Sequence, residues 1–489
     1  MLAARASTRN AQRIARSFAT VADSAGLKVA AVDYNQPTSA VTFLVKAGSR
    51  FESKPGVAHA LKNFAFKSTA KRSAIGTVRE SELYGGVLSA SLGREHLALT
   101  AEFLRGDEEF FVDVLSSFVT SAKYTRHEFE EYVAPVVEGE VTAASADPAT
   151  QAIELAHALA FRSGLGSSLF APSHNSITAE DIKSYAKSAF TKGNIAVIGT
   201  GIDPSVLTQL VEKSLGTAPA AGTTSSPASS YFGGESRTEA HGGPQTVFIG
   251  FGVAGVPSAE LAVLAAHLSP EAAVKWSQGL SPIAAAIPQG TSVQSVYLPY
   301  SDATLVGLLV QGGNAADVKA AGKAAVQALK SAASGISAEE LKKAVAKAKF
   351  AAASAVDSRD GLVSVLGSKV LAGSTTTLDA TLSSFDGLTA TAFKTATSAL
   401  LKGKPTRIPI QALSLAFTAK WYLPETFSHN DCDVIVVINR EDIGGSAVPP
   451  SKRGASKSVN GESPWGSGCF EINVHSSPWV SGRIESFLD

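Results

Sequence analysis

The chain has 489 residues, and its 43 Lys and Arg residues are balanced by 43 Asp and Glu residues. This length is too great for one hydrophobic core and predicts two or three domains. The balanced charge excludes a general electrostatic attraction to nucleic acid, and the presence of only two cysteines, Cys432 and Cys469, excludes a disulfide framework. No segment has the length and composition of a membrane-spanning helix, because the longest uncharged stretch, 276–301, contains three prolines.

The N-terminus carries the clearest targeting signal. Residues 1–22 contain no acidic residue, and four arginines recur at spacings of four, four and three, which places them on one face of a helix. These arginines are Arg5, Arg9, Arg13 and Arg16. An acid-free amphipathic helix with Arg and Ser is typical of a mitochondrial presequence. We therefore expect a presequence over residues 1–18, cut near Phe18 or Ala19; the alternative is a basic arm with no targeting role.

The first half of the chain alternates between strand and helix patterns. Period-two alternation and turn residues predict strands, whereas Asp107 and the capping box Thr125–Glu128 mark the starts of two helices. In chain order, the expected elements are strands at 27–34 and 40–46, a helix at 57–67, strands at 86–93 and 96–104, helices from 108 and from 125, and a buried strand at 194–199.

The second half repeats this order. Three strand patterns lead to Gly313-Asn314 and a helix at 315–333, and Ser337–Glu340 then opens another capped helix. The strand patterns lie at 245–253, 291–298 and 303–311, and the ends of the two halves, 190–193 and 400–403, also match. We predict an internal duplication and an α+β fold of two homologous lobes, 19–216 and 246–406, each a mainly antiparallel sheet packed with helices.

Two segments differ from this repeat. Residues 217–245 are rich in Ala, Gly, Ser, Thr and Pro, which predicts a flexible linker. Residues 407–489 contain both cysteines and three of the four tryptophans, and they start where the second copy should form a strand like 194–199. Our hypothesis is that this tail is foreign to the fold and comes from an incorrect gene structure; the alternative is a genuine extension. Peptides from 421–480 in mass spectrometry of the purified protein would support the extension.

One helix should carry the chemistry, if there is any. After the turn Gly48-Ser-Arg-Phe-Glu52 comes a helix with the pentad His59-Ala-Leu-Lys-Asn63. These residues resemble the first-lobe signature of the pitrilysin/insulinase-type zinc peptidases, which include the mitochondrial processing peptidase. In that family the pentad is His-x-x-Glu-His: the histidines bind zinc, the glutamate activates water, and a downstream glutamate completes the metal shell.

Here the pentad departs from the family at two positions. Lys62 replaces the base and cannot accept a proton while it is charged, and Asn63 replaces the second histidine. Glu140, 77 residues after Asn63, falls near the position of the third ligand, with Glu138 as the alternative. One imidazole and one carboxylate do not complete a zinc site. We therefore expect no catalytic residue, no metal and no cofactor, with His59 a packed or hydrogen-bonded residue and Glu140 a carboxylate on a helix face.

The resemblance extends over residues 24–406. Segments 273–279 and 300–307 look like the second lobe of the non-catalytic family members that form the core of ubiquinol–cytochrome c reductase, respiratory complex III. It implies a structural subunit on the matrix side of the mitochondrial inner membrane. The implied partners are a core protein 1-like subunit, cytochrome b, cytochrome c1 and the iron–sulfur subunit, with peripheral attachment through them and no nucleic acid. The alternative is the non-catalytic, presequence-binding subunit of the processing peptidase, whose glycine-rich loop has no counterpart in 280–290.

A lysine run on a predicted helix is not explained by this function. Lys342, Lys343, Lys347 and Lys349 lie within eight residues. Such a run is most often a solvated helix face, and the alternative is a site for lipid or nucleic acid.

Overall fold

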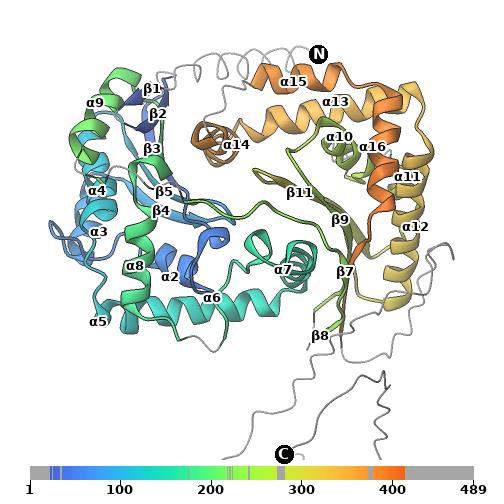
Figure 1. Cartoon of the computed structure of the whole chain (residues 1–489), viewed down its shortest axis with the longest axis horizontal. Helices are drawn as coiled ribbons and strands as arrows, with labels where there is room; N and C mark the ends of the chain where they lie inside the picture. The colour runs from blue at the N-terminus through green and yellow to red at the C-terminus, as the bar shows by residue number, and fades with distance from the viewer. Residues whose placement is uncertain are drawn as a thin grey trace, which may run out of the picture. The chain divides into compact units, whose positions relative to one another are not determined.

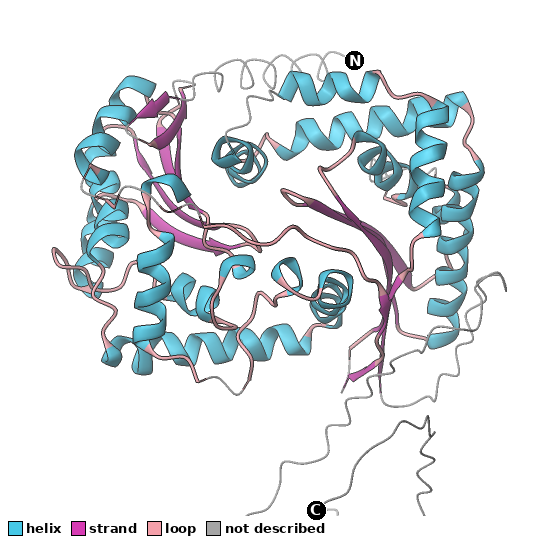
Figure 2. Cartoon of the chain, viewed as in Figure 1, coloured by secondary structure: helices cyan, strands magenta, loops and turns pink. Residues whose placement is uncertain are grey.

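The computed structural model describes residues 22–412 except 25, 34–35, 174–175, 217, 220–221, 223, 241–242, 272–280 and 373–377. The expected presequence, the segment 273–279 and the tail from residue 413 onward lie outside the described residues. The described chain forms two lobes, each with one sheet and a layer of helices (Figures 1 and 2).

The first lobe is built on a six-stranded sheet. Its strands lie in the order β1-β2-β6-β3-β5-β4, and neighbours are antiparallel except for the parallel pair β2–β6. The central strand β3 is buried along almost its whole length, whereas β5 alternates between buried and half-buried residues. The strands are β1 Ala22–Ser24, β2 Leu27–Val32, β3 Thr38–Val45, β4 Val87–Leu92, β5 Leu97–Leu104 and β6 Ile195–Thr200.

The helices of the first lobe supply its core. Phe111, Leu115 and Phe118 on one side of α4 are buried against the sheet, together with α8 and α9. The helices are α2 Val57–Asn63, α3 Ala74–Leu83, α4 Glu108–Ser121, α5 Arg126–Glu128, α6 Ala134–Ala146, α7 Pro148–Phe161, α8 Ala179–Ala189 and α9 Pro204–Leu215. The side chain of Asp107 does not cap α4, contrary to the sequence prediction; instead the Glu108 carboxylate accepts a hydrogen bond from the Gly106 amide.

The second lobe repeats the first. Its sheet order is β10-β11-β9-β12, with β7 and then β8 beside β12, so β12, β9, β11 and β10 correspond in turn to β6, β3, β5 and β4. The parallel pairing of β7 and β8 with β12 matches that of β2 with β6. The duplication and the α+β class are therefore confirmed. The elements are β7 Gly234–Glu235, β8 Thr238–Ala240, β9 Gln245–Ala254, α10 Ala259–Leu268, α11 Pro282–Ala286, β10 Thr291–Pro299, β11 Ala303–Gly312, α12 Ala315–Ser334, α13 Ala338–Ala355, α14 Arg359–Ala372, α15 Leu378–Asp386, α16 Ala390–Lys402 and β12 Thr406–Ala412.

The predicted boundaries of the second lobe need two corrections. Residues 407–412 are not part of a foreign tail, because they belong to β12, an internal strand paired with β9 on one side and with β7 and β8 on the other. The segment 217–245 is not simply a flexible linker, because residues 234–235 and 238–240 are strands of the same sheet. The second lobe therefore begins before and ends after the predicted limits of 246 and 406.

Each lobe covers one face of the other lobe's sheet. Helix α7 of the first lobe buries Ala152, Ala156 and Ala160 against β9, β11 and β12 of the second. Helix α14 of the second lobe buries Leu362 and Val370 against β2, β3 and β6 of the first. Figure 1 shows α7 beside the second sheet and α14 beside the first. The two lobes thus exchange covering helices: α14 covers the first sheet and α7 covers the second.

Local geometry sets the start of α2, the helix that carries the pentad. Gly56 precedes it with φ +87°, and a Cβ there would lie 2.6 Å from the Ala171 Cβ, so only glycine fits. The Glu52 carboxylate accepts hydrogen bonds from the amides of Gly56 and Ala58, which would otherwise be unpaired at the helix start. The helix therefore begins at Val57 in a fixed direction.

Candidate functional site

Two helices bring the pentad and the downstream glutamate together. On α2, His59, Lys62 and Asn63 lie one turn apart and face α6, which carries Glu140. A π-helical turn, Phe129–Val133, precedes α6, and Pro135 in the first turn of α6 has no amide hydrogen to continue regular helical bonding. Of the two candidate glutamates, Glu140 reaches α2, whereas Glu138 is exposed.

The Glu140 carboxylate is the centre of the cluster. It accepts hydrogen bonds from Lys62 Nζ at 2.5 Å and from Asn63 Nδ2 at 2.9 Å, and His59 Nε2 lies 2.5 Å from its Oε2. The His59 side chain is only 3% exposed, and the Phe170 ring packs edge-on against it. We call His59, Lys62, Asn63 and Glu140 the pentad cluster.

The tautomer of His59 follows from a backbone contact. The Ala171 amide donates to His59 Nδ1 at 3.2 Å, and an amide N–H can only donate. Nδ1 must therefore be the unprotonated nitrogen, and Nε2 carries the proton that is donated to Glu140. Burial lowers the pKa of His59 and outweighs the opposing effect of Glu140, which agrees with a neutral ring.

Lys62 supplies the positive charge of the cluster. Burial on its own would raise the pKa of Glu140, but hydrogen bonds from Lys62, Asn63 and His59 outweigh it and lower the pKa from 4.5 to about 2. The carboxylate therefore stays ionised, and its charge is balanced by an ammonium group of the same chain. His59, Lys62 and Asn63 therefore all pair with the same carboxylate, that of Glu140.

These residues do not fit the zinc ion that the fold family implies. Zinc ligation by His59 Nε2 requires that nitrogen to be unprotonated, with Nδ1–H donating to a neighbouring group. Here the neighbour of Nδ1 is itself a donor, Lys62 places a cation beside Glu140, and Asn63 offers a neutral amide. Within the described part of the chain, no group of three His, Cys, Asp or Glu side chains is arranged to hold a metal ion.

A second polar cluster joins the two lobes. The Arg50 guanidinium donates to Glu95 Oε1 at 2.8 Å and makes two parallel bonds to the Asp302 carboxylate, at 2.6 and 2.7 Å. Arg50 Nη2 also donates to the Pro227 carbonyl at 3.2 Å, and the Ser229 amide donates to Asp302 at 2.9 Å. We call these five residues the interlobe clasp.

The sequence placed Arg50 in the family turn but did not indicate its role. Its partners come from the β4–β5 turn, from the segment before β7 and from the β10–β11 turn, up to 252 residues away. No local pattern in the sequence indicated that Arg50 would be buried. In the structure its side chain is 5% exposed. Its hydrogen bonds link the two lobes and the connecting segment.

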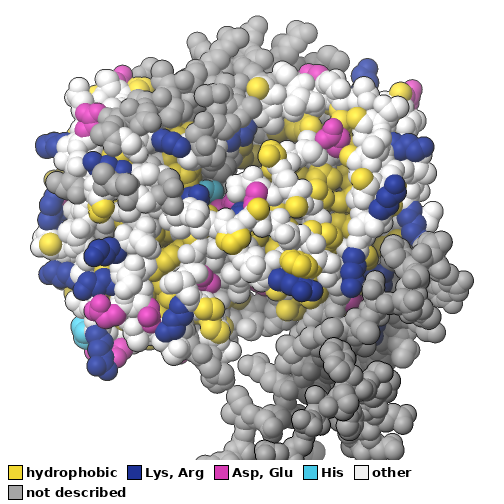
Figure 3. Space-filling model, viewed as in Figure 1, with side chains coloured by type: hydrophobic (Ala, Val, Ile, Leu, Met, Phe, Trp, Pro, Cys, Tyr) yellow, Lys and Arg dark blue, Asp and Glu magenta, His cyan; other side chains and the backbone are white. Residues whose placement is uncertain are grey.

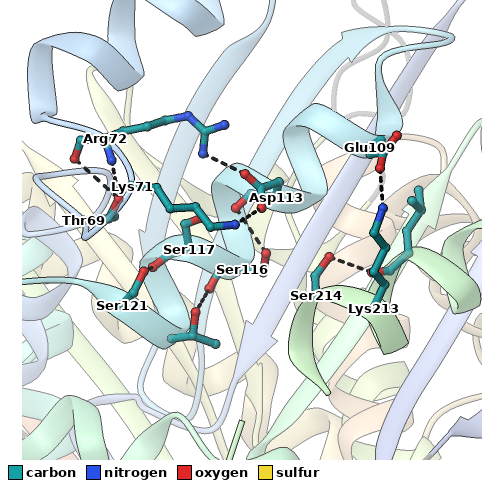
Figure 4. A network of polar contacts seen from close by, with 12 residues as sticks. Thr69, Lys71, Arg72, Glu109, Asp113, Ser116, Ser117, Ser121, Lys213 and Ser214 are labelled. Carbon is teal, nitrogen blue, oxygen red and sulfur yellow. Dashed lines mark hydrogen bonds and ion pairs between the residues drawn. The ribbon is translucent and has the colours of Figure 1, made fainter. Parts of the chain in front are cut away.

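Other charged groups in the first lobe are paired with one another. On α4, Asp113 accepts hydrogen bonds from Lys71 and Arg72, and Glu109 pairs with Lys213 of α9 (Figure 4). Across the face seen in Figure 3, Lys and Arg side chains are scattered and interspersed with Asp and Glu. Such a distribution does not form the continuous basic face that nucleic acid requires. No helix among the described residues has both the length and the apolar composition needed to cross a membrane.

Family models match both lobes. Residues 28–173 match the insulinase (peptidase family M16) model, and residues 176–348 match the peptidase M16 inactive domain. Together with the duplicated two-lobed fold, these matches define a protein of the M16 class.

Several curated relatives carry the name "Cytochrome b-c1 complex subunit 2, mitochondrial". The relative from Cryptococcus neoformans is 42% identical over 420 residues, which cover 84% of this chain and 96% of the relative. The relatives from Yarrowia lipolytica and Neurospora crassa are 38% and 39% identical, over 75% and 78% of this chain and 88% and 86% of their own lengths. The chain therefore belongs to the family of cytochrome b-c1 complex subunit 2 proteins.

Proposed function

We propose that this protein is a structural, non-catalytic core subunit of mitochondrial complex III, which transfers electrons from ubiquinol to cytochrome c. The observation that carries the loss of catalysis is the pairing of Glu140 with Lys62, since it neutralises the remaining carboxylate without a metal ion. Lys62 also stands at the position from which the catalytic members of the family activate water. A protonated amine there cannot act as a general base.

The scaffold contributes surfaces instead of chemistry. The shared helices α7 and α14 and the interlobe clasp hold both lobes as one body, which provides a large surface for neighbouring subunits. The proposed location is the matrix side of the inner membrane. The proposed partners are a core protein 1-like subunit, cytochrome b, cytochrome c1 and the iron–sulfur subunit, and attachment is through them.

The names of the relatives favour complex III over the subunit of a processing peptidase. Co-purification tests this assignment directly. We expect the tagged full-length chain to migrate in a blue native gel of detergent-solubilised mitochondria with b- and c-type haem absorbance. Migration as a soluble dimer of twice the chain's mass, free of haem, would contradict the proposal.

A metal measurement tests the loss of catalysis separately. We expect the purified native protein to hold much less than one zinc ion per chain after dialysis, and to cleave no presequence peptide. A stoichiometric zinc ion that is lost on substitution of His59 by Ala would refute our interpretation of the pentad cluster, whatever complex the chain joins.

A further inference from the structure

The outward face of α13 combines exposed lysines with an exposed phenylalanine. Leu341, Ala344 and Ala348 are buried and anchor the helix on the second lobe. On the other side, Lys342 and Lys343 are exposed, and the Phe350 side chain is 69% exposed. The Phe350 ring therefore adds apolar surface next to the two lysines. We call Lys342, Lys343 and Phe350 the α13 face.

Helix geometry places these residues in one surface strip. Lys342, Ala346 and Phe350 follow one another at intervals of four residues, so they lie nearly in line over about 12 Å, with Lys343 alongside. The buried residues of α13 occupy the opposite side, so the strip faces away from the lobe's core.

The charge around the strip is positive overall, although the exposed Glu339 lies three residues before Lys342 and four before Lys343 on the same side of the helix. Lys347 is half-buried on the same helix, and Lys349 is paired with Asp386 of α15. Both acidic residues of the helix, Glu339 and Glu340, lie in its first turn. Glu340 is engaged in a capping box, where its carboxylate accepts a hydrogen bond from the Ser337 amide at 2.9 Å.

This combination matches an anionic lipid surface better than a nucleic acid. A headgroup layer offers negative charge to lysines and, directly beneath, an apolar layer to an aromatic ring. α13 contains no Arg, Asn or Gln, the side chains that most often form paired hydrogen bonds with base edges. We propose that the α13 face contacts an anionic phospholipid bilayer, with Lys342 and Lys343 on the headgroups and Phe350 inserted at the interface. This contact goes beyond the proposed function, in which partner subunits attach the chain, and does not rest on it.

Vesicle flotation of the full chain tests the lysines. We expect binding to phosphatidylcholine vesicles with about one-third phosphatidylglycerol, weakening in high salt, and little binding to pure phosphatidylcholine. Substituting Lys342→Gln with Lys343→Gln should lower the partition coefficient about 30-fold. The matched control, Lys323→Gln with Lys402→Gln, removes the same charge from exposed positions on α12 and α16 and should change binding less than about twofold.

A third variant tests the phenylalanine. Phe350→Ser should lower binding to the anionic vesicles on the order of tenfold at low and high salt alike, and Phe350→Leu should restore most of it. Circular dichroism melting of each variant verifies that it is folded. An equal loss in the control pair, unchanged binding of Phe350→Ser, no vesicle binding by the folded chain, or lysine-dependent binding to single-stranded RNA instead of vesicles would each overturn the proposal. None of these outcomes changes the expected comigration with haem, so the proposed function is tested separately.

Discussion

The pentad cluster and the interlobe clasp both keep a partly buried carboxylate ionised, but they draw its partners from different parts of the chain. Each is centred on a carboxylate, and in both cases hydrogen-bonded partners overcome burial and lower the pKa to about 2, from 4.5 for Glu140 and from 3.8 for Asp302. The partners of Glu140 lie within the first lobe, on α2, whereas those of Asp302 lie in the first lobe and in the connecting segment. The pentad cluster is therefore stabilised by contacts within one lobe, whereas the clasp joins the two lobes.

The largest difference between the clusters should appear when each cation is removed. Arg50→Met leaves Glu95, 8% exposed, and Asp302 without their cation, and should lower the free energy of unfolding by about 3 kcal/mol. Lys62→Met should cost about 1 kcal/mol, since Glu140 is 34% exposed and partly solvated. Urea unfolding of the full chain measures both, and Arg126→Met, in an exposed ion pair, is the control with almost no effect. A larger loss for Lys62→Met than for Arg50→Met would reverse the comparison.

Proteolysis should distinguish the clasp from the pentad cluster next. Asp302→Ala removes the acceptor of the Ser229 amide and hydroxyl, so the segment before β7 should be cut about tenfold faster by subtilisin. Glu140→Ala should leave that rate unchanged, because no contact of Glu140 reaches this segment among the bonds of the described chain. Equal acceleration in both variants would show that the segment is not held by the clasp.

Acid should weaken both clusters in overlapping pH windows. A carboxylate with a lowered folded-state pKa stabilises the fold above its ordinary value, and this contribution is lost as the pH falls towards about 2. The loss begins near pH 4.5 for Glu140 and near 3.8 for Asp302. After allowance for their exposure, Glu140→Gln and Asp302→Asn should each reduce the acid-induced change in stability by about 1 kcal/mol.

One further carboxyl group acts in the opposite sense. Burial raises the pKa of Glu52 from 4.5 to about 7. Ionisation of this group therefore lowers the free energy of unfolding as the pH rises through that interval. Measuring below pH 4.5 therefore avoids the titration of Glu52, and the difference between each variant and the wild type reports the group that was replaced. Identical acid profiles for wild type and Glu140→Gln would contradict the lowered pKa of Glu140.

The smallest effect is expected from restoring the family pentad. Lys62→Glu combined with Asn63→His should still bind well below one zinc per chain and cleave nothing, because the Ala171 amide continues to hold the proton on His59 Nε2. Elemental analysis after dialysis and a presequence cleavage assay provide the measurement. Stoichiometric zinc in this variant would show that the tautomer is not a barrier.

Residue spacing was enough to predict the repeat, and the family resemblance singled out Glu140 and Glu138, but the hydrogen bonds of Glu140 to α2 were not predicted. Residue spacing did not predict β12, since Pro405 and Pro409 interrupt the strand pattern; in the structure, the break between β7 and β8 lies opposite residues 408–409, where a proline needs no donor on that side. Strands β7 and β8 are too short and too rich in Gly and polar residues to give a periodic signal.

The details of both clusters depend on contacts far apart in sequence. The tautomer of His59 is set by an amide 112 residues away, and the clasp brings together segments separated by 177 and 252 residues. Such pairings follow from the packing of whole lobes and leave no local pattern in a single sequence. The family turn around Arg50 identified the segment but not its partners.

The exchange of covering helices has a consequence for the order of events during synthesis. The first-lobe surface formed by Ala30, Val32, Ala196 and Ile198 is completed by residues 356–371. A nascent chain that emerges N-terminus first therefore leaves this apolar surface open while well over a hundred further residues are translated. Newly made protein therefore passes through a partly folded state with exposed apolar surface, to which chaperones can bind. A chain truncated before α14 would keep that surface exposed permanently.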